Sequence, residues 1–100
     1  MAITTKERAV LKAIAANEPT LFQVGKDGVS RQVEEAVDKA LTARELIKIR
    51  VLNNCEMDVR EVCYMLCEHL KCEPVLLVGT KIVLYRFSPK KAKHIDLKNG

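Results

Sequence analysis

The spacing of apolar residues changes several times along this 100-residue chain, from helical periodicity to strict alternation and back. Near the middle, Ile47, Ile49 and Val51 alternate with basic residues, which predicts a strand with one buried face. The segments before and after it, residues 30–42 and 58–70, carry apolar side chains at helical spacing. A strand between two such helices is typical of an α/β domain with crossover connections. The length suffices for one domain with its own core.

The complete pattern predicts the order helix, strand, helix, strand, helix, strand, strand. The expected helices occupy residues 4–17, 30–42 and 58–70, and the expected strands occupy residues 21–24, 46–51, 74–78 and 81–87. Two strand–helix–strand crossovers predict parallel neighbouring strands, and a final hairpin with Gly79 and Thr80 in its turn adds an antiparallel edge. The predicted fold class is α/β: a compact α-β-α-β-α-β-β domain with a four-stranded mixed sheet.

Polar residues mark the expected helix starts. Thr4 or Thr5 caps the first helix and Ser30 caps the second. Asp58 and Glu61 have the spacing of a capping box, with Asp in place of Ser or Thr, which gives the third helix the clearest start. The apolar stripe of the first helix is expected to consist of Val10, Ala13 and Ile14.

Positive charge is distributed unevenly, although the net charge of +4 is modest. Residues 1–50 hold nine basic and seven acidic side chains, residues 51–80 hold two and five, and residues 81–100 hold six and one. Such a polarised molecule suits a polyanionic partner on one side. Residues 1–88 are expected to form the single domain, and residues 89–100 a basic flexible tail.

The sequence favours a cytoplasmic protein without a membrane partner. It has no apolar run of the ~20 residues that a bilayer requires, and its first residues lack a signal-peptide pattern. No Cys-x-x-Cys pair is present, so we expect no metal and no cofactor, and the cysteines behave as small apolar residues in a reducing compartment. A redox or metal role would instead require bound zinc or a thiol of low pKa. The four cysteines are Cys55, Cys63, Cys67 and Cys72.

The most informative candidate site is the loop Gly25-Lys26-Asp27-Gly28 between a predicted strand and a helix N-terminus. Helix N-termini attract phosphate, and glycines let a sugar-phosphate backbone approach closely. A Gly-x-x-Gly loop clamps nucleotides in KH domains. Alone, however, the motif also fits a plain turn that needs Gly for positive φ. Asp27 places a negative charge at the tip, where it can cap the helix or accept a hydrogen bond from a base or ribose.

Further basic residues can extend this loop into a track for nucleic acid. Candidates are Arg31 beside the loop, Lys48 and Arg50 on the second strand, and Lys81 and Arg86 on the last strand. The alternative is that each of them only solvates an exposed face. Aromatic residues for base stacking are few, so binding is expected to depend on backbone and charge, with limited sequence readout.

No arrangement of residues predicts an enzyme or a small-molecule substrate. His69 is expected to interact with the dipole of its own helix, and no carboxylate pair or Ser/Cys–His set has the spacing of an active site. The glycine loop also lacks the Gly-Lys-Ser/Thr ending of a Walker motif.

Taken together, the motifs resemble the CRM (chloroplast RNA splicing and ribosome maturation) domain family, in the short form of bacterial YhbY-like proteins. The resemblance covers residues 4–88 and lies in an N-terminal helix followed by FQVGKDG (22–28), ELIKIRV (45–51) and VGTKIVLYR (78–86). A basic residue often follows the hairpin glycine in this family, whereas Thr80 stands there in this chain.

The resemblance implies a fold similar to the C-terminal domain of translation initiation factor three. It also implies an RNA-binding protein whose loop residues Gly25–Gly28, with Arg31, contact precursor ribosomal RNA of the large subunit. Nothing in the sequence itself requires more than a monomer. Two alternatives stay open. One is a protein-interaction module that docks a ribosomal or assembly protein, and the other is a DNA-binding protein.

Overall fold

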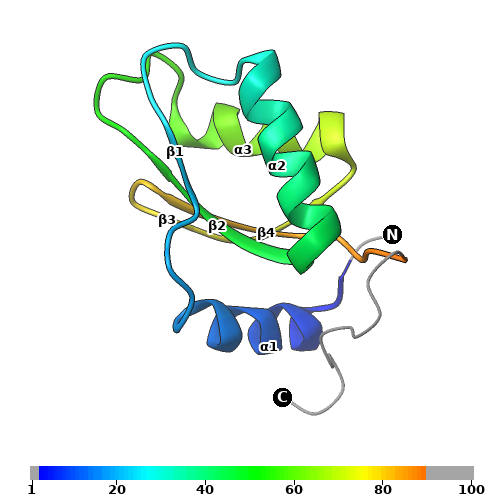
Figure 1. Cartoon of the computed structure of the whole chain (residues 1–100). Coiled ribbons are helices and arrows are strands. Elements are labelled where there is room, and N and C mark those ends of the chain that lie inside the picture. The colour runs from blue at the N-terminus through cyan, green and yellow to red at the C-terminus, as the bar shows by residue number, and fades with distance from the viewer. Residues whose placement is uncertain (1–2, 90–100) are drawn as a thin grey trace.

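The computed structural model describes residues 3–89 (Figure 1). Its elements are α1 (Thr5–Ala15), β1 (Phe22–Val24), α2 (Arg31–Arg44), β2 (Leu46–Val51), α3 (Val59–Leu70), β3 (Glu73–Val78) and β4 (Lys81–Tyr85). The predicted order and the α/β fold class are confirmed. Apart from Pro89, the predicted tail lies outside the described residues. Within residues 3–89, no helix has the length and apolarity needed to cross a membrane.

The four strands form one sheet in the order β1-β2-β4-β3. β1 and β2 are parallel, as predicted for the first crossover. The second crossover does not produce neighbours, because β4 lies antiparallel between β2 and β3. The expectation that β4 would be an antiparallel edge is therefore wrong, and the antiparallel edge is β3, with β1 at the other edge.

The composition of the hairpin explains why β4 occupies the centre. Its residues 82–85 are all buried, so this strand needs cover on both faces. β3 begins with Glu73 and Pro74, and Pro is tolerated at a sheet edge because it has no N–H to donate. A register shift between Pro74 and Leu76 interrupts the pairing of β3 with β4 further.

Helices cover both faces of the sheet: α1 packs on one face, and α2 and α3 pack on the other (Figure 1). The larger cluster, under α2 and α3, includes Val37, Leu41, Ile49, Val62, Leu66, Ile82 and Leu84. The smaller cluster, under α1, contains Leu11, Ala15, Leu46, Val75, Val83 and Tyr85. Ile47, Ile49 and Val51 face the larger cluster as predicted. The other face of β2 was expected to be open, but α1 covers its first part at Leu46.

Two predicted details of the helices are wrong. In the predicted stripe of α1, Val10 is buried and Ile14 packs against the smaller cluster, but Ala13 is exposed, and Leu11 and Ala15 complete the buried face. Asp58 does precede α3, but its side chain makes no capping hydrogen bond. The reciprocal capping box instead occurs at α1, between Thr4 and Glu7.

The C-terminal end of α3 provides a test of the backbone geometry. Lys71 ends this helix in the left-handed conformation with φ of 56°, which costs an L-residue about 1 kcal/mol relative to Gly. We expect Lys71→Gly to raise the free energy of unfolding by about 1 kcal/mol in chemical denaturation. As a matched control, Lys12→Gly inside α1 should lower it by about 1 kcal/mol. A loss of stability in both variants would contradict the assigned helix end.

Candidate nucleic-acid interface

The loop of residues 25–28 is a closed turn at the end of β1. The Gly28 N–H donates to the Gly25 carbonyl at 3.0 Å, which leaves Lys26 and Asp27 exposed at the tip. The Ser30 hydroxyl accepts from the Val33 N–H at 3.2 Å and caps α2, as predicted. Asp27 is therefore not the helix cap, and within residues 3–89 it has no hydrogen-bond or ion-pair partner.

The two glycines of the loop have different roles. Gly28 has φ of +62°, and a Cβ there would lie 2.9 Å from the Met57 sulfur. Gly25 lacks a positive φ, and a Cβ there would make ordinary contacts with Asn54 and Leu52, at 3.5 and 3.6 Å. Only Gly28 is therefore required by the backbone, and Gly25 could carry a methyl group without a clash.

The connection between β2 and α3 packs against the glycine loop, a feature that the sequence did not reveal. The two connections lie side by side at the same end of the sheet (Figure 1), and the Leu52 N–H donates to the Val24 carbonyl at 2.8 Å. Asn54, an exposed amide, lies against Gly25. It is an additional candidate contact, and an Asn-Asn pair directly after a strand was the only sequence signal for it.

The β3–β4 hairpin reaches this same end of the sheet. The Val51 N–H donates to the Thr80 carbonyl at 2.7 Å, and the strand register places Arg50 directly opposite Lys81. Both side chains are exposed, and neither has an acidic partner among residues 3–89. We call this region the loop end of the sheet: the loop of residues 25–28 together with Asn54, Arg50 and Lys81.

Arg50 and Lys81 lie on the face of the sheet that α1 covers only in part. Lys81 is two residues from Val83 on β4, and Val83 packs under α1, so both point to that face. Gln23 pairs with Arg50 in the register and is also exposed. Lys48 lies one row further in, opposite Val83, and is half-buried. The open part of this face thus carries two facing cations at its outer row.

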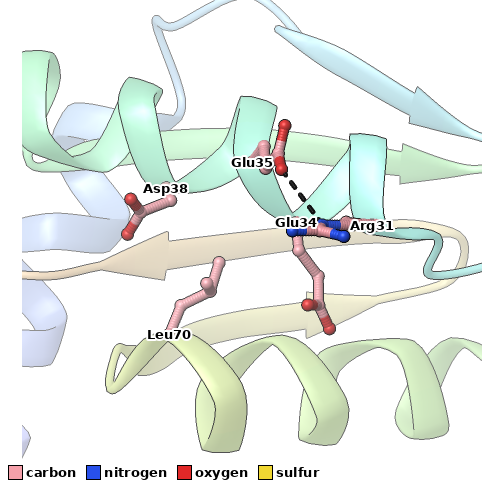
Figure 2. Close-up of a pocket in the computed structure, with 5 residues that line it drawn as sticks. All are labelled: Arg31, Glu34, Glu35, Asp38 and Leu70. Atoms are coloured by element: carbon pink, nitrogen blue, oxygen red, sulfur yellow. Dashed lines mark ion pairs between the residues drawn. The ribbon is translucent and has the colours of Figure 1, made fainter.

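Arg31 lies near the glycine loop but in a different electrostatic setting. Its side chain is 92% exposed and pairs with Glu35 at 3.4 Å, an exposed pair of the kind that contributes about 0–1 kcal/mol. Arg31 lines a pocket of about 310 Å³ between α2 and α3. Glu34, Glu35, Asp38 and Leu70 also line this pocket (Figure 2). Carboxylates dominate this pocket, so it does not suit a phosphate.

Arg86 lies at the opposite end of the sheet, just beyond β4. Its guanidinium donates to the Asp38 carboxylate at 2.7 Å, to the carbonyls of Asp38 and Leu70 at 2.9 and 2.8 Å, and to the Thr42 hydroxyl at 3.0 Å. The structure therefore does not bring Arg86 together with the other predicted site residues. Its contacts tie the end of β4 to α2 and α3.

The aromatic residues, His69 and the cysteines lie in different environments. Of the few aromatic residues, Tyr85 is 6% exposed and packs under α1, so it cannot stack on a base, whereas Phe87 is 56% exposed. His69 lies in the last turn of α3, the position expected for an interaction with the helix dipole, and it also contacts Glu34 on α2. All four cysteines are free thiols, and residues 3–89 contain no group of three or more His, Cys, Asp or Glu arranged to hold a metal ion.

The difference between the two glycines is testable. We expect Gly28→Ala to lower the free energy of unfolding by about 1–2 kcal/mol, because the left-handed backbone becomes strained and Met57 must move. Gly25→Ala should change it by less than about 0.5 kcal/mol. Urea denaturation of both variants measures the difference, and an equal loss in both would contradict the assigned turn.

Comparison with known proteins places this geometry in a family. The sequence pattern of the CRS1/YhbY (CRM) domain matches residues 3–86. "Probable RNA-binding protein YqeI" of Bacillus subtilis is 40% identical over 95 residues, covering 95% of this chain and 98% of the relative. "Probable RNA-binding protein PA4753" of Pseudomonas aeruginosa is 26% identical over 96% of this chain and 92% of the relative.

A solved structure has the same fold. The solution structure of the hypothetical protein SAV1595 from Staphylococcus aureus superimposes with a TM-score of 0.79 at 38% identity, covering 96% of this chain and 98% of that one. The pattern match and the relatives both span nearly the whole described domain. The chain belongs to the CRS1/YhbY (CRM) domain family.

Proposed function

We propose that this protein binds RNA at the loop end of the sheet. The observation that carries the proposal is the convergence of three separate segments there: the turn with Lys26 at its tip, Arg50 at the end of β2, and Lys81 at the start of β4. Like charges directly opposite each other destabilise a sheet. A phosphate between Arg50 and Lys81 would relieve this repulsion. The names of the curated relatives, which describe RNA-binding proteins, support the same proposal.

The dimensions of the loop end suit a short length of nucleic-acid backbone. From the end of β1 to β4 is two strand spacings, roughly 10 Å, which leaves room for successive phosphates of one strand. Phosphate contacts give affinity with little sequence information. Asp27 beside Lys26 can only accept hydrogen bonds, so a ribose 2′-hydroxyl or a base amino group is its natural partner.

We further propose that the RNA is a precursor of large-subunit ribosomal RNA and that the protein acts as a monomeric assembly factor in the cytoplasm. The support is the resemblance of its motifs to YhbY-like proteins. The protein would position RNA and perform no bond-breaking step. Neither a nucleophile–base pair nor a paired carboxylate site occurs at the loop end as described.

A charge reversal on β2 tests the proposed RNA surface. Arg50→Glu places a carboxylate opposite Lys81, which should preserve the fold because it creates a cross-strand ion pair. It should weaken binding of a short single-stranded RNA by about tenfold or more and reduce the slope of log affinity against log salt by about two. The wild-type slope should be about −3 to −5 for roughly 4–6 phosphate contacts.

Lys39→Glu on the exposed side of α2 is the matched control, because it changes the net charge equally and lies outside the loop end. Equal weakening by both variants would show that only net charge matters. DNA of the same length and sequence, run in parallel, tests the alternative of a DNA-binding protein.

The ribosomal part of the proposal requires a test in the cells of origin. On sucrose gradients, wild type should co-sediment with large-subunit precursors, whereas the Lys26→Glu, Arg50→Glu double variant should stay at the top. If the double variant still co-sediments, a protein contact holds the protein on the particle, and the protein-interaction alternative is favoured. Wild type at the top of a low-salt gradient would contradict the ribosomal assignment.

A further inference from the structure

Three of the four cysteines gather at the C-terminal end of α3. Cys63 and Cys67 are one helical turn apart, and Cys72 follows the helix directly. Cys63 and Cys72 are buried, and Cys67 is half-buried. The Cys72 thiol donates to the Leu66 carbonyl at 3.5 Å. RNA binding at the loop end makes no use of these groups.

The backbone explains why Cys67 and Cys72 meet. Lys71 is left-handed, and the Cys72 N–H donates to the Cys67 carbonyl at 3.2 Å. This is the hydrogen bond of a Schellman motif, in which the first and last residues commonly bring their side chains into contact. Apolar residues usually occupy these two positions, but here both are thiols. This helix end therefore places Cys67 and Cys72 next to each other.

We infer that Cys67 and Cys72 form a reversible oxidation site, at which a hydroperoxide converts the two thiols into a disulfide. The Cys72 sulfur attacks one peroxide oxygen, the O–O bond breaks, and a sulfenic acid and water result when the peroxide is hydrogen peroxide. The Cys67 sulfur then attacks the Cys72 sulfur and displaces the oxygen as a second water. Two thiols lose two electrons and two protons, and the peroxide is reduced to two waters.

The electrostatic environment assigns these roles to the two thiols. The hydrogen bond with Cys67 lowers the pKa of Cys72, and the Arg86 guanidinium contributes in the same direction, against the effect of burial. A hydrogen bond with Cys63 lowers the pKa of Cys67, but the hydrogen bond with Cys72 and burial raise it to about 12. Of the two thiols, Cys72 therefore has the lower pKa and is assigned the reaction with peroxide, and Cys67 is the neighbouring thiol that resolves the sulfenic acid.

A disulfide between Cys67 and Cys72 can be detected by tryptic digestion, because Lys71 lies between the two cysteines. The purified full-length protein is reduced, freed of reductant, treated with hydrogen peroxide, blocked with N-ethylmaleimide and digested with trypsin. Trypsin cleaves after Lys71, so Cys67 and Cys72 fall on separate peptides that only a disulfide holds together. We expect this linked pair, its separation by dithiothreitol, and a fall from four titratable thiols to two in denaturant. Cys72 oxidised to sulfinic acid without a cross-link would overturn the inference.

Two variants identify the partner of Cys72. Cys67→Ala should abolish the linked peptides, whereas Cys63→Ala, with folding checked by circular dichroism, should retain them. The reverse pattern would assign the bond to Cys63 and overturn the inference. Cys55, before the other end of α3, is an internal control that should be recovered alkylated. Cys72 precedes Glu73, and Glu73 pairs with Tyr85, at the opposite end of β4 from Lys81. Oxidation should therefore leave RNA affinity unchanged, so the oxidation proposal and the RNA proposal can fail separately.

Discussion

Burial of β4 on both faces is the constraint on which the rest of this structure depends. Ile82 and Leu84 pack under α2 and α3, while Val83 and Tyr85 pack under α1, so this strand joins the two clusters of the core. Its central position also sets the register that places Lys81 opposite Arg50. The same packing that stabilises the domain therefore assembles the proposed RNA surface at the first residue of the strand.

The two ends of the sheet use their cations differently. At the far end, Arg86 is enclosed by four hydrogen bonds to α2 and α3, which is a structural role. At the loop end, Lys26, Arg50 and Lys81 have no acidic partner within residues 3–89, although acidic side chains are common elsewhere on the domain. A polyanion is thus attracted to one end of the sheet. The carboxylates between α2 and α3 disfavour its binding along the helices.

Much of the fold could be predicted because periodicity and caps are local signals. Ser30, the alternation over β2 and the hairpin turn at Gly79 and Thr80 were assigned correctly from spacing alone. The position of β4 was not, because strand order depends on which strand most needs burial, and that is a property of the whole domain. The support of Gly25 by Asn54 was missed for the same reason, since the two residues meet only through parallel pairing of β1 and β2. Arg86 was grouped with the RNA surface because it is a basic residue on the same predicted strand as Lys81. Its contacts with α2 and α3 at the other end of β4 depend on the packing of the whole domain.

The most direct test of the central claim is to map amide chemical shifts of the labelled protein during titration with a short single-stranded RNA. The account predicts that the largest changes occur at residues 25–28, Asn54, Arg50 and Lys81, while residues near Arg86 and the end of α3 stay unchanged. Changes concentrated in the acidic pocket between α2 and α3, or none at low salt, would contradict it.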